Sequence, residues 1–237
     1  MDRFVTRTQA IEIELRPEGA DAFAFPVTDV VIAGWSGRDR EAARAYVDRL
    51  VGGGFEAPGT IPAFYRVAPS LLTTAESIDV VGGRTSGEVE VVLFSTGQGL
   101  FVGLGSDHTD RELAPSSVAR AKQICAKPVA GRVWRYEEVA DHWDELVLRA
   151  QVPGEDGALV DYQRATLGEI MPVDDLLERL AANEDRGLPQ GWVLFCGTVP
   201  VPSGIRASEF FCMSLTDPRL ARDITHGYTI RTLPLVR

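Results

Sequence analysis

Residues 87–94 read Gly-Glu-Val-Glu-Val-Val-Leu-Phe, and this stretch decides how the rest of the chain is interpreted. The four consecutive apolar residues at its end indicate a strand that enters the protein core. Side chains two positions apart on a strand project from the same face, so Glu88 and Glu90 should point the same way. A divalent cation between them would remove the repulsion of two like charges. Carboxylate oxygens without nearby cysteine or histidine suit Mg²⁺ or Mn²⁺, with Ca²⁺ as a third choice.

The same spacing also fits an exposed pair of acids on an edge strand. Glu12 and Glu14 lie in an alternating stretch near the start of the chain, and we expect both of them to be solvated. The interpretation of Glu88 and Glu90 as metal ligands therefore depends on other parts of the chain.

Strands dominate the elements predicted on either side, and glycine-rich turns separate them. Predicted strands cover residues 10–15, 27–33, 77–81, 88–94, 99–103, 146–152, 157–165, 192–196, 209–215 and 228–233. Predicted helices cover residues 39–50, 117–124, 136–145 and 173–183. This order is not the βαβ alternation of a doubly wound sheet and favours an α+β fold. A Pro/Gly-containing stretch at residues 58–62 predicts a boundary between an N-terminal module, 1–57, and a larger domain, 58–237.

Charge and cysteine content limit the partners and the compartment. Acidic residues outnumber basic ones by 34 to 24, so nucleic acid and anionic membranes would both repel the chain. No apolar run is long enough to span a bilayer. Cys125, Cys196 and Cys212 show no CxxC spacing, which is typical of a cytoplasmic protein with reduced thiols.

Four segments, in order, resemble the fumarylacetoacetate hydrolase superfamily, in a bacterial branch of it, over roughly residues 60–237. The first is the Glu-x-Glu strand at residues 87–93. The second, residues 103–113, contains an Asp followed four positions later by Arg and then an acid, here Asp107, Arg111 and Glu112. Lys127, in Ala-Lys-Pro, follows about twenty residues on. Residues 191–200 resemble the C-terminal Gly-Asp-x-Ile-x-Thr-Gly-Thr-Pro segment, with a one-residue difference before the proline.

The resemblance implies a mixed β-sandwich roll with a small N-terminal α/β module, and a homodimer. It implies an enzyme that acts on a small anionic 2-oxo or 1,3-dioxo acid through a metal-stabilised enolate, as a C–C hydrolase, decarboxylase or isomerase. The implied metal ligands are Glu88, Glu90 and Asp107. The implied catalytic residues are Lys127, Thr198 and His108. The implied substrate-binding residues are Arg66, Gln163, Gly197 and Arg111, of which Arg111 fits equally as an ion-pair partner of Asp110 or Glu112.

One family feature is missing. Many hydrolases of the superfamily carry a His-x-x-Glu pair on a short N-terminal helix, which activates water. The comparable helix here, Arg-Ala-Tyr-Val-Asp-Arg at residues 44–49, has no histidine. A decarboxylase, lyase or isomerase needs no such pair and is therefore favoured over a hydrolase.

Two other functions stay open. One is a non-catalytic binding or assembly protein with solvated carboxylates. The other is a thiol enzyme that uses Cys125 with His108 or His142, although a buried thiol and a solvated His142 are the simpler expectations.

Overall fold

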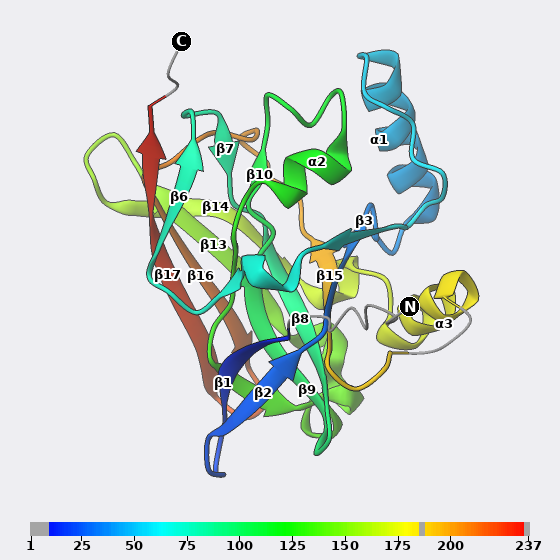
Figure 1. Cartoon of the computed structure of the whole chain (residues 1–237), viewed down its shortest axis with the longest axis vertical. Coiled ribbons are helices and arrows are strands. Elements are labelled where there is room, and N and C mark those ends of the chain that lie inside the picture. Colours follow the sequence, from blue (N-terminus) through cyan, green and yellow to red (C-terminus); the bar gives the residue numbers. More distant parts are fainter. Residues whose placement is uncertain (1–9, 185–187, 235–237) are drawn as a thin grey trace, which may run out of the picture.

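Two mixed β-sheets packed against each other form the centre of the protein in a computed structural model that describes residues 10–184 and 188–234 (Figure 1). The larger sheet has eight strands. Their order is β2 (Phe23–Val27), β1 (Ile11–Pro17), β12 (Arg132–Arg135), β9 (Gly99–Ser106), β8 (Val89–Thr96), β15 (Trp192–Thr198), β3 (Asp29–Gly34) and β4 (Ala63–Val67).

The smaller sheet has five strands, and two short strand pairs lie beside the sheets. The five are β14 (Leu159–Thr166), β13 (Val147–Pro153), β16 (Phe210–Asp217), β17 (Arg222–Leu233) and β6 (Ser77–Val81). The short pairs are β10 (Thr109–Asp110) with β7 (Thr85–Ser86), and β11 (Lys127–Pro128) with β5 (Leu72–Thr73).

Three α-helices and four 3₁₀ turns complete the described part of the chain. The α-helices are α1 (Arg40–Gly52), α2 (Val118–Gln123) and α3 (Val173–Glu184). The 3₁₀ turns are η1 (Pro69–Leu71), η2 (Tyr136–Glu138), η3 (Ala140–Glu145) and η4 (Leu167–Glu169). No helix in this part has the length and apolarity that crossing a membrane requires.

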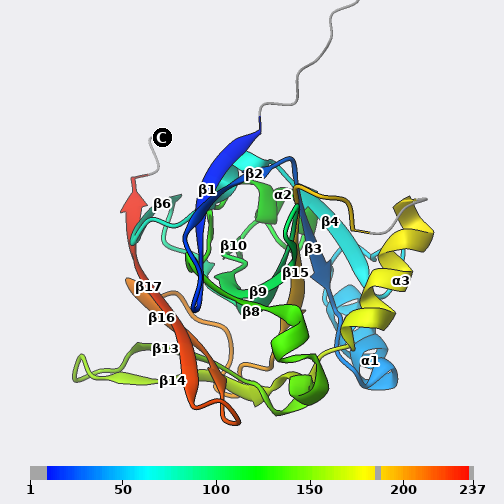
Figure 2. The same ribbon diagram turned by 90° about the horizontal axis from the view of Figure 1, so that it is seen from below.

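The two faces of β8 pack into two different apolar clusters. Val89, Val91 and Leu93 lie in the cluster between the two sheets. Val92 and Phe94 lie in a second cluster, to which all eight strands of the larger sheet contribute side chains, among them Leu15, Ile32 and Phe195. Figure 2 shows the eight-stranded sheet curling round, with β13, β14, β16 and β17 as an outer layer. Because side chains alternate along a strand, Glu90 shares the inner face with Val92 and Phe94.

The strand-dominated α+β fold predicted from the sequence is confirmed, and so are most of the predicted elements. The helix predicted over residues 136–145 is wrong, because the segment forms the 3₁₀ turns η2 and η3 with non-helical dihedrals at His142. Strands β2, β4 and β12 were not predicted, nor were the two-residue strands β5, β7, β10 and β11. The division at residue 57 stays a prediction, although β1, β2 and β3 share one sheet with β8, β9 and β15.

His142 is buried, so the expectation that it is solvated is wrong. Its Nδ1 lies 2.5 Å from Asp141 Oδ1 and its Nε2 lies 3.0 Å from Asp217 Oδ1. Burial opposes the charged imidazolium, but the hydrogen bonds to Asp141 and Asp217 outweigh it and raise the pKa of His142. The ring therefore links η3 to the end of β16.

We expect His142→Gln to lower the free energy of unfolding most at acidic pH. Because the pKa of His142 is higher in the folded state, the protonated ring contributes its full stabilisation below the unfolded pKa of about 6.5. This stabilisation is lost as pH rises through the folded pKa. The loss should be about 1.5–3 kcal/mol at pH 5.5, the value of hydrogen bonds to charged groups, and smaller at pH 9. Urea unfolding at both pH values measures it. His226→Gln is the control with the opposite sign, since burial lowers the pKa of His226. A deficit for His142→Gln that is equal at both pH values contradicts the prediction.

Candidate metal centre

The hairpin of β8 and β9 brings three carboxylates together. Glu88 precedes β8, Glu90 lies within it, and Asp107 follows β9 directly. Antiparallel pairing sets Val89 opposite Ser106, and the Asp107 N–H donates to the Glu88 carbonyl over 2.9 Å. One carboxylate oxygen from each of the three acids lies within 4.8 Å of the others. The hairpin register therefore places Asp107 beside Glu88 and Glu90, which the alternation of side chains along the strand had already placed on one face.

The chemistry of this cluster fits a divalent metal ion. Glu90 is 2% exposed and Asp107 is 0% exposed, while Glu88 keeps limited access to solvent. Burial, and next the charge of Asp107, raise the pKa of Glu90 well above its ordinary value. A divalent ion would relieve the repulsion between the carboxylates of Glu90 and Asp107. Three hard oxygen donors are also the kind of ligand that Mg²⁺ and Mn²⁺ prefer. Glu88, Glu90 and Asp107 are thus the residues able to hold the ion.

Three cationic side chains surround the carboxylates. Arg111 Nη2 lies 3.1 Å from Glu88 Oε1, Lys127 Nζ lies 3.5 Å from Asp107 Oδ1, and Lys122 on α2 forms an ion pair with Asp107. Lys122 is 6% exposed. Burial opposes its charge, but Asp107, Glu88 and Glu90 outweigh burial and raise the pKa of Lys122. Arg111 forms its ion pair with Glu88, not with Asp110 or Glu112 as the alternative interpretation expected.

Lys122 is a site residue that the sequence analysis missed. It lies in the polar-looking helix predicted at residues 117–124, and a lysine there normally extends into solvent. In the structure Lys122 and Ala121 are the buried positions of α2, and the sequence carries no signal of this. Only the packing of α2 against β4 and β10 brings its ammonium group to Asp107.

Lys127 points into the protein. Its side chain is fully buried, and Nζ donates to the carbonyls of His108, Lys122 and Cys125 over 2.7, 2.5 and 2.9 Å. Burial is the largest influence and lowers the pKa of Lys127. These bonds fix the loop that carries Asp107 and the end of α2, so Lys127 shapes the site in addition to any contact with a substrate.

Gly197 and Thr198 border the carboxylates from β15. The Gly197 N–H donates to Glu90 Oε2 over 2.8 Å, and its φ of 108° is a conformation that side-chain-bearing residues rarely adopt. The Thr198 hydroxyl donates to the Val89 carbonyl over 2.8 Å. Gln163 accepts from the Val89 N–H and donates to Thr198 Oγ1 and the Val199 carbonyl, at 3.0, 2.7 and 2.6 Å. Gln163 therefore joins β14, β8 and β15 beside the site.

His108 and Tyr228 hold the residues on both sides of Asp107. The Tyr228 hydroxyl lies 2.8 Å from Ser106 Oγ and 3.0 Å from His108 Nδ1. His108 Nε2 lies 2.8 Å from Thr85 Oγ1. Burial and then the charge of Lys127 lower the pKa of His108 to about 3, which keeps the ring neutral. Both ring nitrogens of this predicted catalytic residue are thus occupied by protein hydroxyls.

Arg66 lies away from the carboxylates. Its guanidinium stacks on Trp192 with 4.5 Å to the ring centroid and pairs with Asp29 at 2.6 Å. Trp192 begins β15, whereas Gly197 and Thr198 end it, so Arg66 is at the opposite end of that strand. Its predicted contact with a substrate finds no support in this placement.

The thiol alternative is disfavoured by the surroundings of Cys125. The side chain is buried, and burial raises the pKa of the thiol to about 11, so the reactive thiolate is scarce at neutral pH. Neither His108 nor His142 is hydrogen-bonded to it among the described residues, since each has other partners.

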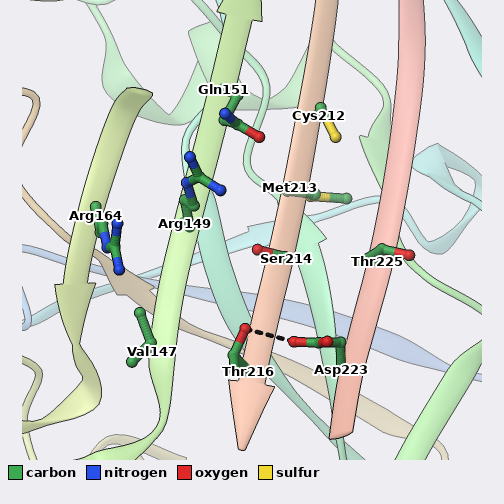
Figure 3. A pocket seen from close by; sticks show the side chains of 10 residues that line it. All are labelled: Val147, Arg149, Gln151, Arg164, Cys212, Met213, Ser214, Thr216, Asp223 and Thr225. Carbon is green, nitrogen blue, oxygen red and sulfur yellow. Dashed lines mark hydrogen bonds between the residues drawn. The ribbon is translucent and has the colours of Figure 1, made fainter. Parts of the chain in front are cut away.

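Two open hollows of about 340 Å³ each lie elsewhere on the described surface. One follows the outer face of the five-stranded sheet, where Arg149, Gln151, Ser214 and Thr225 line it (Figure 3). The other surrounds η3, beside His142. Neither is lined by a member of the carboxylate cluster, so the metal-ligating chemistry lies outside both hollows.

The chain belongs to the family described as "Protein of unknown function (DUF2848)", whose profile matches residues 33–228. No protein with a curated description matches it significantly. Among solved structures it is similar to 2-keto-3-deoxy-D-arabinonate dehydratase complexed with magnesium and 2,5-dioxopentanoate. The identity is 14% and the TM-score 0.62, over 87% of this chain and 74% of the other.

Two further structures of that dehydratase agree with this likeness. The hexagonal crystal form is 15% identical, with a TM-score of 0.64 over 91% of this chain and 79% of the other. The apo form is 14% identical, with a TM-score of 0.64 over 90% and 77%. At such low identity the likeness concerns the fold, which is of the fumarylacetoacetate hydrolase type.

We expect Glu90→Gln to weaken Mn²⁺ binding by about 100-fold or more, because it removes a buried charged ligand, whereas changes behind a ligand typically cost 10–100-fold. Titration calorimetry or the electron paramagnetic resonance of free Mn²⁺ measures this. Glu12→Gln is the matched control, since Glu12 belongs to the exposed Glu-x-Glu pair on β1. Unchanged Mn²⁺ affinity in a folded Glu90→Gln variant would exclude the site.

We expect Tyr228→Phe to weaken Mn²⁺ binding by about tenfold, although Tyr228 is not a ligand. Loss of the hydroxyl frees Ser106 and His108, and Asp107 lies between them. The free energy of unfolding should fall by only about 1–2 kcal/mol. Calorimetry with Mn²⁺ and urea unfolding separate the two effects, and a stability loss with full metal affinity would show that Tyr228 only supports the core.

Proposed function

We propose that this protein is a divalent-metal-dependent enzyme that acts on a small 2-oxo or 1,3-dioxo acid through an enolate. The single observation that carries the proposal is the convergence of Glu88, Glu90 and Asp107 within 4.8 Å, with Glu90 and Asp107 buried. Mg²⁺ or Mn²⁺ is the proposed ion. The magnesium and 2,5-dioxopentanoate bound by the dehydratase of similar fold support this choice.

The charges around the cluster favour an anionic substrate. Arg111, Lys122 and Lys127 formally balance Glu88, Glu90 and Asp107. A divalent ion held by the three carboxylates would leave two positive charges in excess and would supply the charge that stabilises an enolate. The enolate of a 2-oxo acid carries two negative charges, one of them on its carboxylate. The site is therefore electrostatically matched to that species.

The chain's own residues have distinct parts in this proposal. Gly197 holds Glu90 through its backbone N–H, and Lys127 holds the backbone of His108, next to Asp107, and the end of α2. Lys122 and Arg111 stand beside the ligands as cations that can attract the substrate carboxylate. The Thr198 side chain is partly exposed next to Glu90 and offers a polar contact at the same edge.

Among the possible reactions, a lyase or isomerase type is favoured over C–C hydrolysis. Hydrolysis needs a group that deprotonates water, and α1 carries no histidine. His108, the histidine nearest the cluster in sequence, is neutral and bonded to Tyr228 and Thr85. A dehydratase, decarboxylase or isomerase proceeds from the enolate without such a pair. The cytoplasmic location and the homodimer expected from the sequence stay predictions.

Proton exchange at the carbon beside the oxo group tests the proposal. Wild-type protein with Mg²⁺ in D₂O should exchange the C3 protons of 2-oxobutanoate or of a 3-deoxy-2-oxo sugar acid, followed by ¹H nuclear magnetic resonance. Glu90→Gln should slow the exchange by about 100-fold or more, since several kcal/mol of charge stabilisation is lost.

The Glu12→Gln variant should exchange at the wild-type rate. Equal exchange with Mg²⁺ and with a chelator contradicts the proposal. Tight binding of oxalate to the Mg²⁺-loaded protein without exchange of any tested acid indicates the alternative, a protein that binds such ligands without converting them.

A further inference from the structure

Two aromatic rings stand at one side of the carboxylate cluster. Tyr65 on β4 pairs with Ile32 in the sheet register, and both belong to the inner face that also carries Glu90. The Tyr65 ring lies over Gly34, where a Cβ would come within 2.9 Å of Tyr65 Cε2. The Trp35 ring meets it edge to face, with 5.9 Å between the centroids and 69° between the planes. We call Trp35 and Tyr65 the aromatic pair.

The aromatic pair is connected to the ligands on two sides. Lys122 Nζ lies 5.6 Å from the Tyr65 ring centroid and pairs with Asp107, so one ammonium group separates the ring from a ligand. Ser36, the neighbour of Trp35, donates its hydroxyl to the Cys196 carbonyl over 2.7 Å. The next residue of that strand, Gly197, holds Glu90.

The backbone holds Trp35 in an unusual conformation. Its φ is 55°, in the left-handed region that large side chains avoid. Such outliers persist where the surrounding structure imposes them and gather at ligand clamps and active sites. Trp35 and Tyr65 are both partly buried, so each residue keeps some surface accessible to solvent.

We propose that the aromatic pair is the wall that receives the substrate's chain beyond its oxo-acid head, and that this chain ends in a planar or apolar group. The inference rests on the proposed function, because the oxo-acid head must sit at the carboxylate cluster. Aromatic rings contribute to binding through contact with apolar and π surfaces in preferred offset or edge-to-face arrangements. A substrate with an aryl or alkyl end fits this wall better than a short polyhydroxy acid.

Binding of matched 2-oxo acids to the Mn²⁺-loaded full chain tests the inference. The probes are 2-oxobutanoate and 2-oxo-4-phenylbutanoate, which differ by the phenyl group, with oxalate as a probe of the cluster alone. Calorimetry should show about tenfold tighter binding of the phenyl compound to wild-type protein, the effect of one additional aromatic contact. Oxalate should bind equally to wild type and to every variant of the aromatic pair.

Three substitutions separate the ring contact from a loss of structure. Trp35→Gly removes the ring and accepts the positive φ without strain, and Tyr65→Leu keeps an apolar side chain over Gly34. Each should reduce the preference for the phenyl compound to about threefold or less, while Trp35→Phe should retain most of it. Tyr46→Ala, which removes an exposed ring from α1, is the control and should keep the full preference.

The outcomes distinguish this inference from the proposed function. A wild-type protein that binds oxalate but shows no preference for the phenyl compound overturns the inference alone. So does a preference that survives in both Trp35→Gly and Tyr65→Leu. Failure of the wild-type protein to bind Mn²⁺ or oxalate overturns the proposed function and this inference together.

Discussion

The balance of buried charge at the β8–β9 hairpin constrains the surrounding structure. Glu90 and Asp107 are taken almost entirely out of water, and unpaired carboxylates in such surroundings are costly. Ion pairs offset this cost. Asp107 pairs with Lys122 and Lys127, and the neighbouring Glu88 pairs with Arg111. Each cation comes from a segment that must dock at a fixed place for the balance to hold. Lys122 lies on α2, which packs against β4 and β10, and Lys127 lies on β11, which packs against β9.

The curled sheet gives the hairpin two different faces. Its outer face packs Val89, Val91 and Leu93 against the five-stranded sheet, and this apolar contact holds the two layers together. Its inner face ends in the carboxylates, beside Gly197 and the aromatic pair. The same strand thus stabilises the fold with one face and carries the ligands on the other. Tyr228 connects the two, because it belongs to the outer layer yet anchors both neighbours of Asp107.

Several features of the structure could not be predicted from the sequence, for identifiable physical reasons. Residues 136–145 were predicted as one helix but form 3₁₀ turns, and His142, where the dihedrals are non-helical, is bonded to Asp217 from another element. Lys122 looks like a surface lysine because burial of a charge becomes tolerable only beside carboxylates from another element. Arg66 matched the position of a family residue, yet Asp29 and Trp192 draw it to the far end of β15. In each case the decisive partner is distant in sequence.

The sequence alone determined that Glu88 and Glu90 share one face of a strand that enters the core, because strand geometry has a period of two. It also determined that strands dominate the fold, since alternation and turn residues are local signals. Asp107, Lys127 and Gly197-Thr198 were found by resemblance, and the hairpin register and the contacts of β15 show why they meet. The tertiary structure alone decided which cations face the carboxylates and that Tyr65 and Trp35 stand beside them. Those contacts join residues from β3, β4 and α2, whose relative placement depends on how the sheet curls, and no local pattern encodes that curl.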